Sequence, residues 1–291
     1  MLTNQDIYKI EEMAKEKRRS HELGMGPLGE NLYKVIRSHG IQLIQVPFAD
    51  DEGNETDPFS ALYLASKENE YSICFIGINT AEYGDKQIFA LAHELYHHYE
   101  STEPFVLCRG LDNVSESREL RANRFAAEFL IPTERLVHEI KEKNNGDQLL
   151  IKWTLKGLLR LIAGLHCDYR LPYKALVRRL HEIHAIDDEQ LELLLRVDAR
   201  DPNGMYWIIG TNINPGVFAQ LNSKSKSFGV EGENLGKLMG NFEDGLISLQ
   251  ELSEDLSLFG KSLEDYRLME EMVKDDEEDM SLLFKGDENE S

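Results

Sequence analysis

The sequence predicts an α+β fold, because segments with the two-residue alternation of strands lie between segments with helical periodicity. The strand-like segments fall between residues 41 and 79 and are rich in β-branched and aromatic side chains. Segments with apolar residues three or four positions apart flank them on both sides. The order helix, strands, helix, helix favours a small sheet covered by helices and followed by a mainly helical region.

The elements are expected in the following order. The first 40 residues predict two helices separated by a turn in GMGPLG, and IQLIQVPF, ALYLAS and YSICFIGIN predict three strands. Asp85 is a suitable N-cap for the next helix. The buried stripe of that helix is expected to contain Ile88, Leu91, Ala92, Leu95 and Tyr99. Another helix, from about Ser115 to Leu130, should end before Pro132, because proline cannot continue a helix.

The composition divides the chain into three expected regions. Residues 1–135 hold the α+β domain, residues 136–200 predict short packed helices, and residues 201–291 predict an acidic helical region with a disordered tail. The last region carries 20 acidic and 7 basic side chains, a net charge of −13 out of −21 for the chain. Phosphate repels such a field, so binding of nucleic acid through bulk charge is disfavoured.

Three sequence features bear on the compartment. The longest apolar runs fall far short of the roughly 20 residues that span a bilayer, so no membrane contact is expected. The N-terminus lacks the basic patch and apolar core of a secretory signal. Cys74, Cys108 and Cys167 form no C-x-x-C pair and suit free thiols in a reducing compartment. These observations predict a cytoplasmic protein.

The segment FALAHELYHHYES contains the pattern H-E-x-x-H within a predicted helix. His93 and His97 are four residues apart, so both imidazoles project from nearly the same side of the helix and can grip one metal ion. Glu94 is rotated by about 100° and can act as general base on a metal-bound water. A pattern with three fixed positions also arises by chance, so a third ligand is the deciding feature.

The third ligand is not supplied by the same segment. The longer pattern H-E-x-x-H-x-x-G-x-x-H fails, because Glu100 and Glu103 occupy its glycine and last histidine positions. The next helix offers Glu119 as a ligand and Asn123 as a partner for the second nitrogen of a ligand imidazole. Rival ligands are Asp112, Glu116, His138 and His166, and candidate donors to an oxyanion are Tyr83, His98 and Tyr173.

Two segments, IFALAHELYHH and ELRANRFAAEFLIP, together resemble the ImmA/IrrE family of metallopeptidases. The family pattern has A-H-E-L-x-H on one helix and E-x-x-A-N-x-F-A before an apolar pair and proline on the next. The positions that fall on the second motif are Glu119, Ala122, Asn123, Phe125, Ala126, Ile131 and Pro132. The resemblance covers roughly residues 30 to 135, and the chain departs from it at Tyr96, where the family usually has glycine.

The resemblance implies a zincin-like protease domain with a gluzincin-like Zn²⁺ site. His93, His97 and Glu119 would be the ligands, and Glu94 the catalytic base. Members of the family are similar to regulatory proteases that cut a helix-turn-helix repressor of the XRE type and so induce stress-response or mobile-element genes. Residues 136–200 resemble the helix-turn-helix-like part that follows the protease domain in this family.

Two other hypotheses for the function of the chain stay open. A non-catalytic antirepressor would keep the fold and bind the repressor without cutting it, although pure binding does not need Glu94. Residues 150–180 hold seven basic side chains against a single Asp168 and offer a DNA contact. For this segment a solvated helix face is favoured, because no base-reading motif accompanies the charges.

Overall fold

The computed structural model describes residues 2–48, 60–68, 71–100, 105–107, 113–230, 232–258, 261–266 and 268. The chain divides into two compact units, residues 1–227 and residues 228–291. The sequence predicts boundaries after residues 135 and 200 instead, and that three-part division stays a prediction. The predicted disordered tail lies largely outside the described residues.

The sheet of the first unit has the strand order β4-β2-β3-β1. The strands are β1 (Ile41–Val46), β2 (Ala61–Glu68), β3 (Tyr71–Asn79) and β4 (Phe105–Leu107). β2 runs antiparallel to both β3 and β4, whereas β1 is parallel to β3. The sequence predicts the first three strands, and β4 is an addition that only the structure shows.

The remaining elements of the first unit are helices. They are α1 (Asn4–Ser20), α2 (Asn31–Ser38), α3 (Gly84–Glu100), α4 (Asn113–Leu130), α5 (Thr133–Lys143), α6 (Leu155–Tyr169), α7 (Tyr173–Glu182), α8 (Asp188–Leu195), α9 (Met205–Ile213) and α10 (Pro215–Leu221). The second unit contains β5 (Gly229–Val230), α11 (Gly232–Glu243), α12 (Leu249–Leu258) and the 3₁₀ helix η1 (Leu263–Tyr266).

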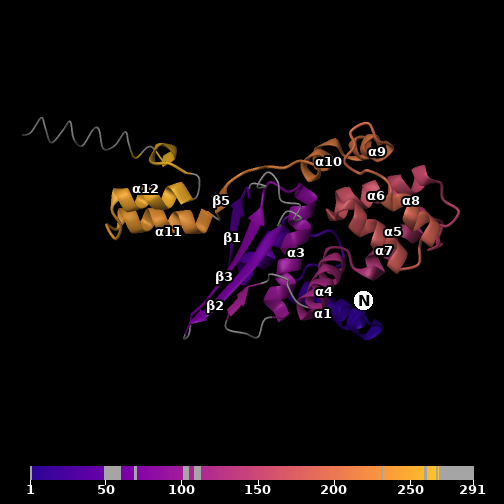
Figure 1. The fold of residues 1–291 in the computed structure, drawn as a ribbon, viewed down its shortest axis with the longest axis horizontal. Helices are drawn as coiled ribbons and strands as arrows, with labels where there is room; N and C mark the ends of the chain where they lie inside the picture. The colour runs from indigo at the N-terminus through magenta and orange to yellow at the C-terminus, as the bar shows by residue number, and fades with distance from the viewer. Residues whose placement is uncertain are drawn as a thin grey trace, which may run out of the picture. The chain divides into compact units, whose positions relative to one another are not determined.

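The first unit is layered. Helix α3 lies against β2 and β3, α4 packs on α3, and α1 packs on α4, while α5 to α8 gather beyond them (Figure 1). Ile76 of the sheet, Leu91 and Leu95 of α3, and Phe125 and Phe129 of α4 are all buried in one core. The predicted α+β fold, with a small sheet, an H-E-x-x-H helix and a helical region after it, is confirmed.

The start of α3 differs from the prediction. The helix begins at Gly84, so Asp85 lies inside its first turn and is not the N-cap. Asp85 is fully buried, and its two carboxylate oxygens accept hydrogen bonds from Arg200 at 2.6 and 2.7 Å. A Cβ atom at position 84 would lie 2.7 Å from the carbonyl oxygen of Gln220. Glycine therefore lets the end of α10 pack directly on the start of α3.

The end of α4 agrees with the prediction. The helix stops at Leu130, and Pro132 takes the N-cap position of α5 with an extended ψ of 142°. Because the residue before proline is driven out of the helical region, α5 leaves in a new direction. Among the described residues, we find no helix with the length and apolar character needed to cross a membrane.

Candidate metal centre

Helix α3 presents two different faces. Ile88, Leu91 and Leu95 are buried on the predicted apolar stripe. His93 and His97, four residues apart, point away from that stripe and meet Glu119, which projects from α4. The packing of α4 on α3 therefore brings together three side chains that the sequence assigns to one metal site.

The donor atoms of these three side chains form a small triangle. Nε2 of His93 lies 3.2 Å from Nε2 of His97 and 2.9 Å from Oε2 of Glu119. Nε2 of His97 lies 3.4 Å from Oε1 of Glu119. Within the described part of the chain, these residues form a cluster whose ligand atoms lie within 4.8 Å of one another.

The triangle has the dimensions of a metal-ligand set. Bonds of about 2.0–2.1 Å to a tetrahedral zinc ion place neighbouring ligand atoms about 3.3 Å apart. The observed separations of 2.9, 3.2 and 3.4 Å surround that value. Two imidazoles and one carboxylate are also ligands that a divalent first-row metal accepts. The residues present therefore fit a bound divalent cation.

Asn123 fixes the orientation of one ligand. Its Oδ1 lies 3.1 Å from Nδ1 of His93, where it accepts the ring proton. A proton on Nδ1 leaves the lone pair on Nε2, which faces Glu119 and His97. Asn123 stands one turn after Glu119 on α4, so the spacing that the sequence singles out places both residues beside His93.

The charges of the triangle depend on one another. Hydrogen bonds from His93 and His97 hold the pKa of Glu119 well below its usual range, although burial acts the other way. Burial lowers the pKa of His93, but the hydrogen bond to Glu119 and the charges of Glu94 and Glu119 outweigh it and raise that pKa overall. Both shifts express the same demand for positive charge between the carboxylate and the rings.

Glu94 lies beside the triangle as a buried carboxyl group. The residue is 5% exposed, and its Oε2 has no hydrogen-bond partner among the described residues. Burial raises the pKa of Glu94, while the charges of His93 and His97 act against the shift. A carboxylate with an open oxygen and a raised pKa is suited to accept and release a proton.

The rival ligands lie elsewhere in the structure. Nε2 of His138 is 3.1 Å from Glu142 on the surface of α5, and His166 is buried in α6. Glu116 is exposed in the first turn of α4. Asp112 lies outside the described residues. The structure thus gathers Glu119, rather than His138, His166 or Glu116, with the two histidines.

The three candidate oxyanion donors each have another contact. The Tyr83 ring lies 4.1 Å below the guanidinium of Arg200, and the Tyr173 hydroxyl donates to a backbone carbonyl of α8 at 3.0 Å. Nδ1 of His98 lies 3.0 Å from the hydroxyl of Tyr63. The choice among these donors stays a prediction.

The apolar surroundings of the centre were not predicted from the sequence. Phe89 and Leu120 line a groove together with Asn123. Phe89 precedes His93 by one helical turn, and Leu120 directly follows Glu119. The sequence did contain a signal for this groove, because both residues are large and apolar, lie next to predicted ligands and fall outside the buried stripe of their helix.

Comparison with known proteins supplies one match. The family model described as Peptidase_M78, IrrE N-terminal-like domain, matches residues 37–181. The matched segment runs from the end of α2 into α7 and includes the whole triangle as well as Glu94 and Asn123. No curated protein and no solved structure matches the chain.

Proposed function

Because the chain belongs to the ImmA/IrrE family of peptidases, with an IrrE N-terminal-like domain, we propose that it is a zinc-dependent endopeptidase. Its substrate in this proposal is a specific regulatory protein, an XRE-type helix-turn-helix repressor. Cleavage would release stress-response or mobile-element genes from repression. The site of action would be the cytoplasm, where the free thiols of Cys74 and Cys167 are stable.

One observation carries the proposal. His93, His97 and Glu119 point three electron-pair donors at a common position, with separations of 2.9 to 3.4 Å. Glu94 adds a buried carboxylate that is not one of the three proposed ligands. A structural metal site has no use for such a base, whereas a hydrolytic site needs one.

Each residue has a distinct task in the proposed reaction. His93, His97 and Glu119 would hold the ion, and Asn123 keeps His93 in the tautomer that leaves Nε2 free. A zinc ion held there would supply Lewis-acid polarisation of a carbonyl group and would lower the pKa of a water molecule to about 7. Glu94 would accept a proton from the attacking water and donate it to the leaving amine. Its raised pKa suits both halves of this transfer.

The proposal is tested by mapping new protein N-termini in a native cell lysate that contains an XRE-type repressor. Zinc-loaded wild-type protein is compared with Glu94→Gln. We expect one discrete cleavage in the repressor with the wild type, and a rate lower by roughly 10²- to 10⁴-fold in the variant, the usual contribution of a general base. Both proteins should hold the same amount of zinc.

The opposite outcome is equally clear. If zinc-loaded wild-type protein relieves repression while the repressor stays intact, or if Glu94→Gln relieves it equally well, the chain acts by binding. The non-catalytic antirepressor then replaces the peptidase.

A further inference from the structure

A groove with a volume of about 890 Å³ lies next to the metal centre, between α4 and α7. Its walls include Leu120, Asn123 and Ala127, which share one face of α4. Asn123 is also the hydrogen-bond partner of His93, so the groove is lined by a residue that directly contacts one of the three ligands. Its volume is within the roughly 300–1,000 Å³ of typical ligand sites.

The walls of the groove are largely apolar. Phe89 contributes from α3, Val137 from α5 and Ala175 from α7. Leu120 is 38% exposed, a large fraction for a leucine beside a candidate site. An open apolar surface of this kind gains free energy when a partner's apolar side chains cover it.

The acidic residues of the groove have ion-pair partners, whereas two of its basic residues are exposed. Its two acidic residues are engaged, since Glu11 accepts from Arg124 at 2.6 Å and Glu182 from Arg179 at 3.1 Å. Lys174 and Arg178 are exposed, one turn apart on α7.

Within the part of the chain that the structure describes, neither Lys174 nor Arg178 has an acidic partner. This basic rim belongs to a chain with a net charge of −21. The groove is therefore a local exception to the charge of the whole molecule.

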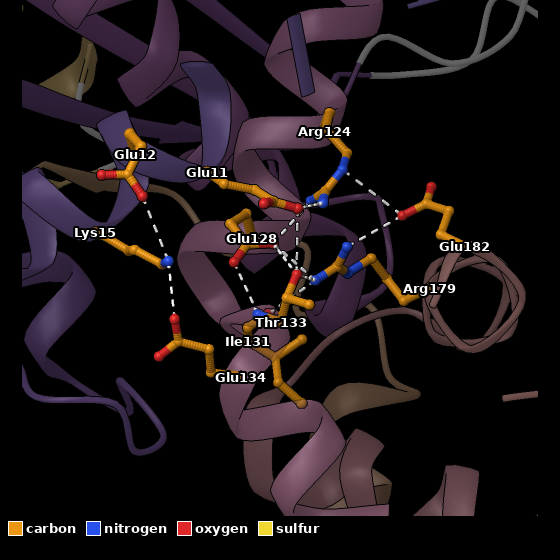
Figure 2. Close-up of polar contacts among 10 residues, drawn as sticks. All are labelled: Glu11, Glu12, Lys15, Arg124, Glu128, Ile131, Thr133, Glu134, Arg179 and Glu182. Atoms are coloured by element: carbon orange, nitrogen blue, oxygen red, sulfur yellow. Dashed lines mark hydrogen bonds and ion pairs between the residues drawn. The ribbon is translucent and has the colours of Figure 1, made fainter. Parts of the chain in front are cut away.

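A buried network holds α7 in place against α4. Oε2 of Glu128 accepts from Arg124 at 2.9 Å and from Arg179 at 2.8 Å. Figure 2 shows Arg179 and Glu182 reaching from α7 toward Arg124 and Glu128 on α4, with Glu11 beside them. Arg179 and Glu128 are at most 1% exposed. The rim of α7 is thus fixed relative to the helix that carries Glu119.

We propose that this groove binds the part of the protein substrate that adjoins the scissile bond, and that this part is an acidic amphipathic segment. Its apolar side chains would cover Leu120, Ala127 and Ala175, while its carboxylates would face Lys174 and Arg178. The inference rests on the proposed peptidase function, because it places a substrate beside the metal centre. An apolar floor suits a peptide better than the evenly charged backbone of DNA.

The test measures binding separately from cleavage. A fluorescein-labelled peptide that alternates Leu or Phe with Asp or Glu is titrated with the full-length Glu94→Gln protein, which should cleave it far more slowly than the wild type. The same protein carrying Lys174→Glu and Arg178→Glu should bind roughly tenfold more weakly, because two rim attractions become repulsions. A peptide with Lys in place of the acidic residues should bind more weakly than the acidic one.

A matched control changes the same charges on another helix. Lys156 and Arg160 are also exposed and one turn apart, on α6, and neither lines the groove. Replacing both by Glu should leave the affinity within about twofold, since only long-range charge is altered. A neutral variant, Ala175→Tyr, fills the groove and should weaken binding without any change of charge. Melting curves confirm that each variant is folded.

Three results would overturn the inference. They are equal losses in the α7 and α6 double variants, no measurable binding of the acidic peptide, and a duplex DNA probe that binds through Lys174 and Arg178 in place of the peptide. Zinc content and repressor cleavage are measured on the same preparations. If the repressor is cleaved and the groove variants have no effect, only the substrate-binding role of the groove is rejected. If the peptide binds through the groove but the protein holds no zinc and cleaves nothing, only the proposed peptidase function is rejected.

Discussion

Two glutamates on α4 occupy opposite kinds of site. Glu119, near the start of the helix, faces two imidazoles and has a side chain that is 36% exposed. Glu128, 2.5 turns further on, faces two guanidinium groups and is fully buried. The same residue type on the same helix therefore serves one open polar cluster and one closed polar cluster.

The difference lies in the balance of donors and acceptors. Around Glu128, permanently charged arginines and Thr133 supply the hydrogens, and its two oxygens accept them. Around Glu119, Asn123 holds a proton on Nδ1 of His93, so a neutral His93 turns the lone pair of its Nε2 toward the acceptor oxygens of Glu119. A cluster of acceptors is completed by a cation, whereas the Glu128 cluster is complete without one.

The largest difference between the two sites is expected when each carboxylate is neutralised in metal-free protein and the free energy of unfolding is measured. Glu128→Gln leaves two arginines without their buried counter-ion and should lower the free energy of unfolding by about 3–5 kcal/mol. Glu119→Gln removes a partly exposed carboxylate and should change it by less than about 1 kcal/mol. Urea unfolding of both variants measures the two effects. Similar losses at the two positions would contradict the proposed contrast.

A second prediction concerns Asn123, which holds His93 in the Glu119 cluster. Asn123→Ala removes the acceptor that fixes His93 and should weaken zinc binding by about 10- to 100-fold. Competition with a chromophoric chelator gives the affinity. Asn123→Asp, which keeps an acceptor at the same place, is the matched control and should retain most of it. Equal affinities for the alanine variant and the wild type would show that His93 needs no such partner.

A smaller effect is expected when the stability of the Glu128 cluster is measured at lower pH. The charges of Arg179 and Arg124 and the hydrogen bonds from Thr133 outweigh burial and lower the pKa of Glu128 below its ordinary value of 4.5. A lowered pKa in the folded state stabilises the protein above pH 4.5, and that contribution disappears as the pH falls through the folded-state value. The stability gap between wild type and Glu128→Gln should therefore stay level from pH 7 to about pH 5 and narrow as the pH falls below 4.5. A stability gap that widens below pH 4.5 would show that the pKa of Glu128 is raised in the folded protein.

The sequence predicts local features of this molecule better than distant ones. His93 and His97 share a helix face by spacing alone, and Glu119 and Asn123 do so on the next helix, so four residues of the centre follow from periodicity. Their meeting across two helices was one of several possibilities that the residues offered, and the family resemblance singled it out. The parallel pairing of β1 with β3 and the short strand β4 left no local signal.

Long-range ion pairs explain the misses. Asp85 has the residue type of an N-cap, but Arg200, 115 residues away, draws it into the first turn as a buried partner. Arg179 belongs to a basic run that predicts a solvated face, yet it is 1% exposed and bound to Glu128, 51 residues earlier. Such contacts depend on how the helices pack, which helix periodicity does not specify.

The zinc content of purified protein tests the central claim most directly. Wild type, Glu119→Ala and Glu128→Gln are loaded with zinc, freed of excess and analysed by atomic emission. A three-ligand site predicts about one zinc per chain in the wild type and in folded Glu128→Gln, and a marked loss in Glu119→Ala. No zinc in the wild type, or equal zinc in all three proteins, would contradict the assignment of the Glu119 cluster as a metal centre.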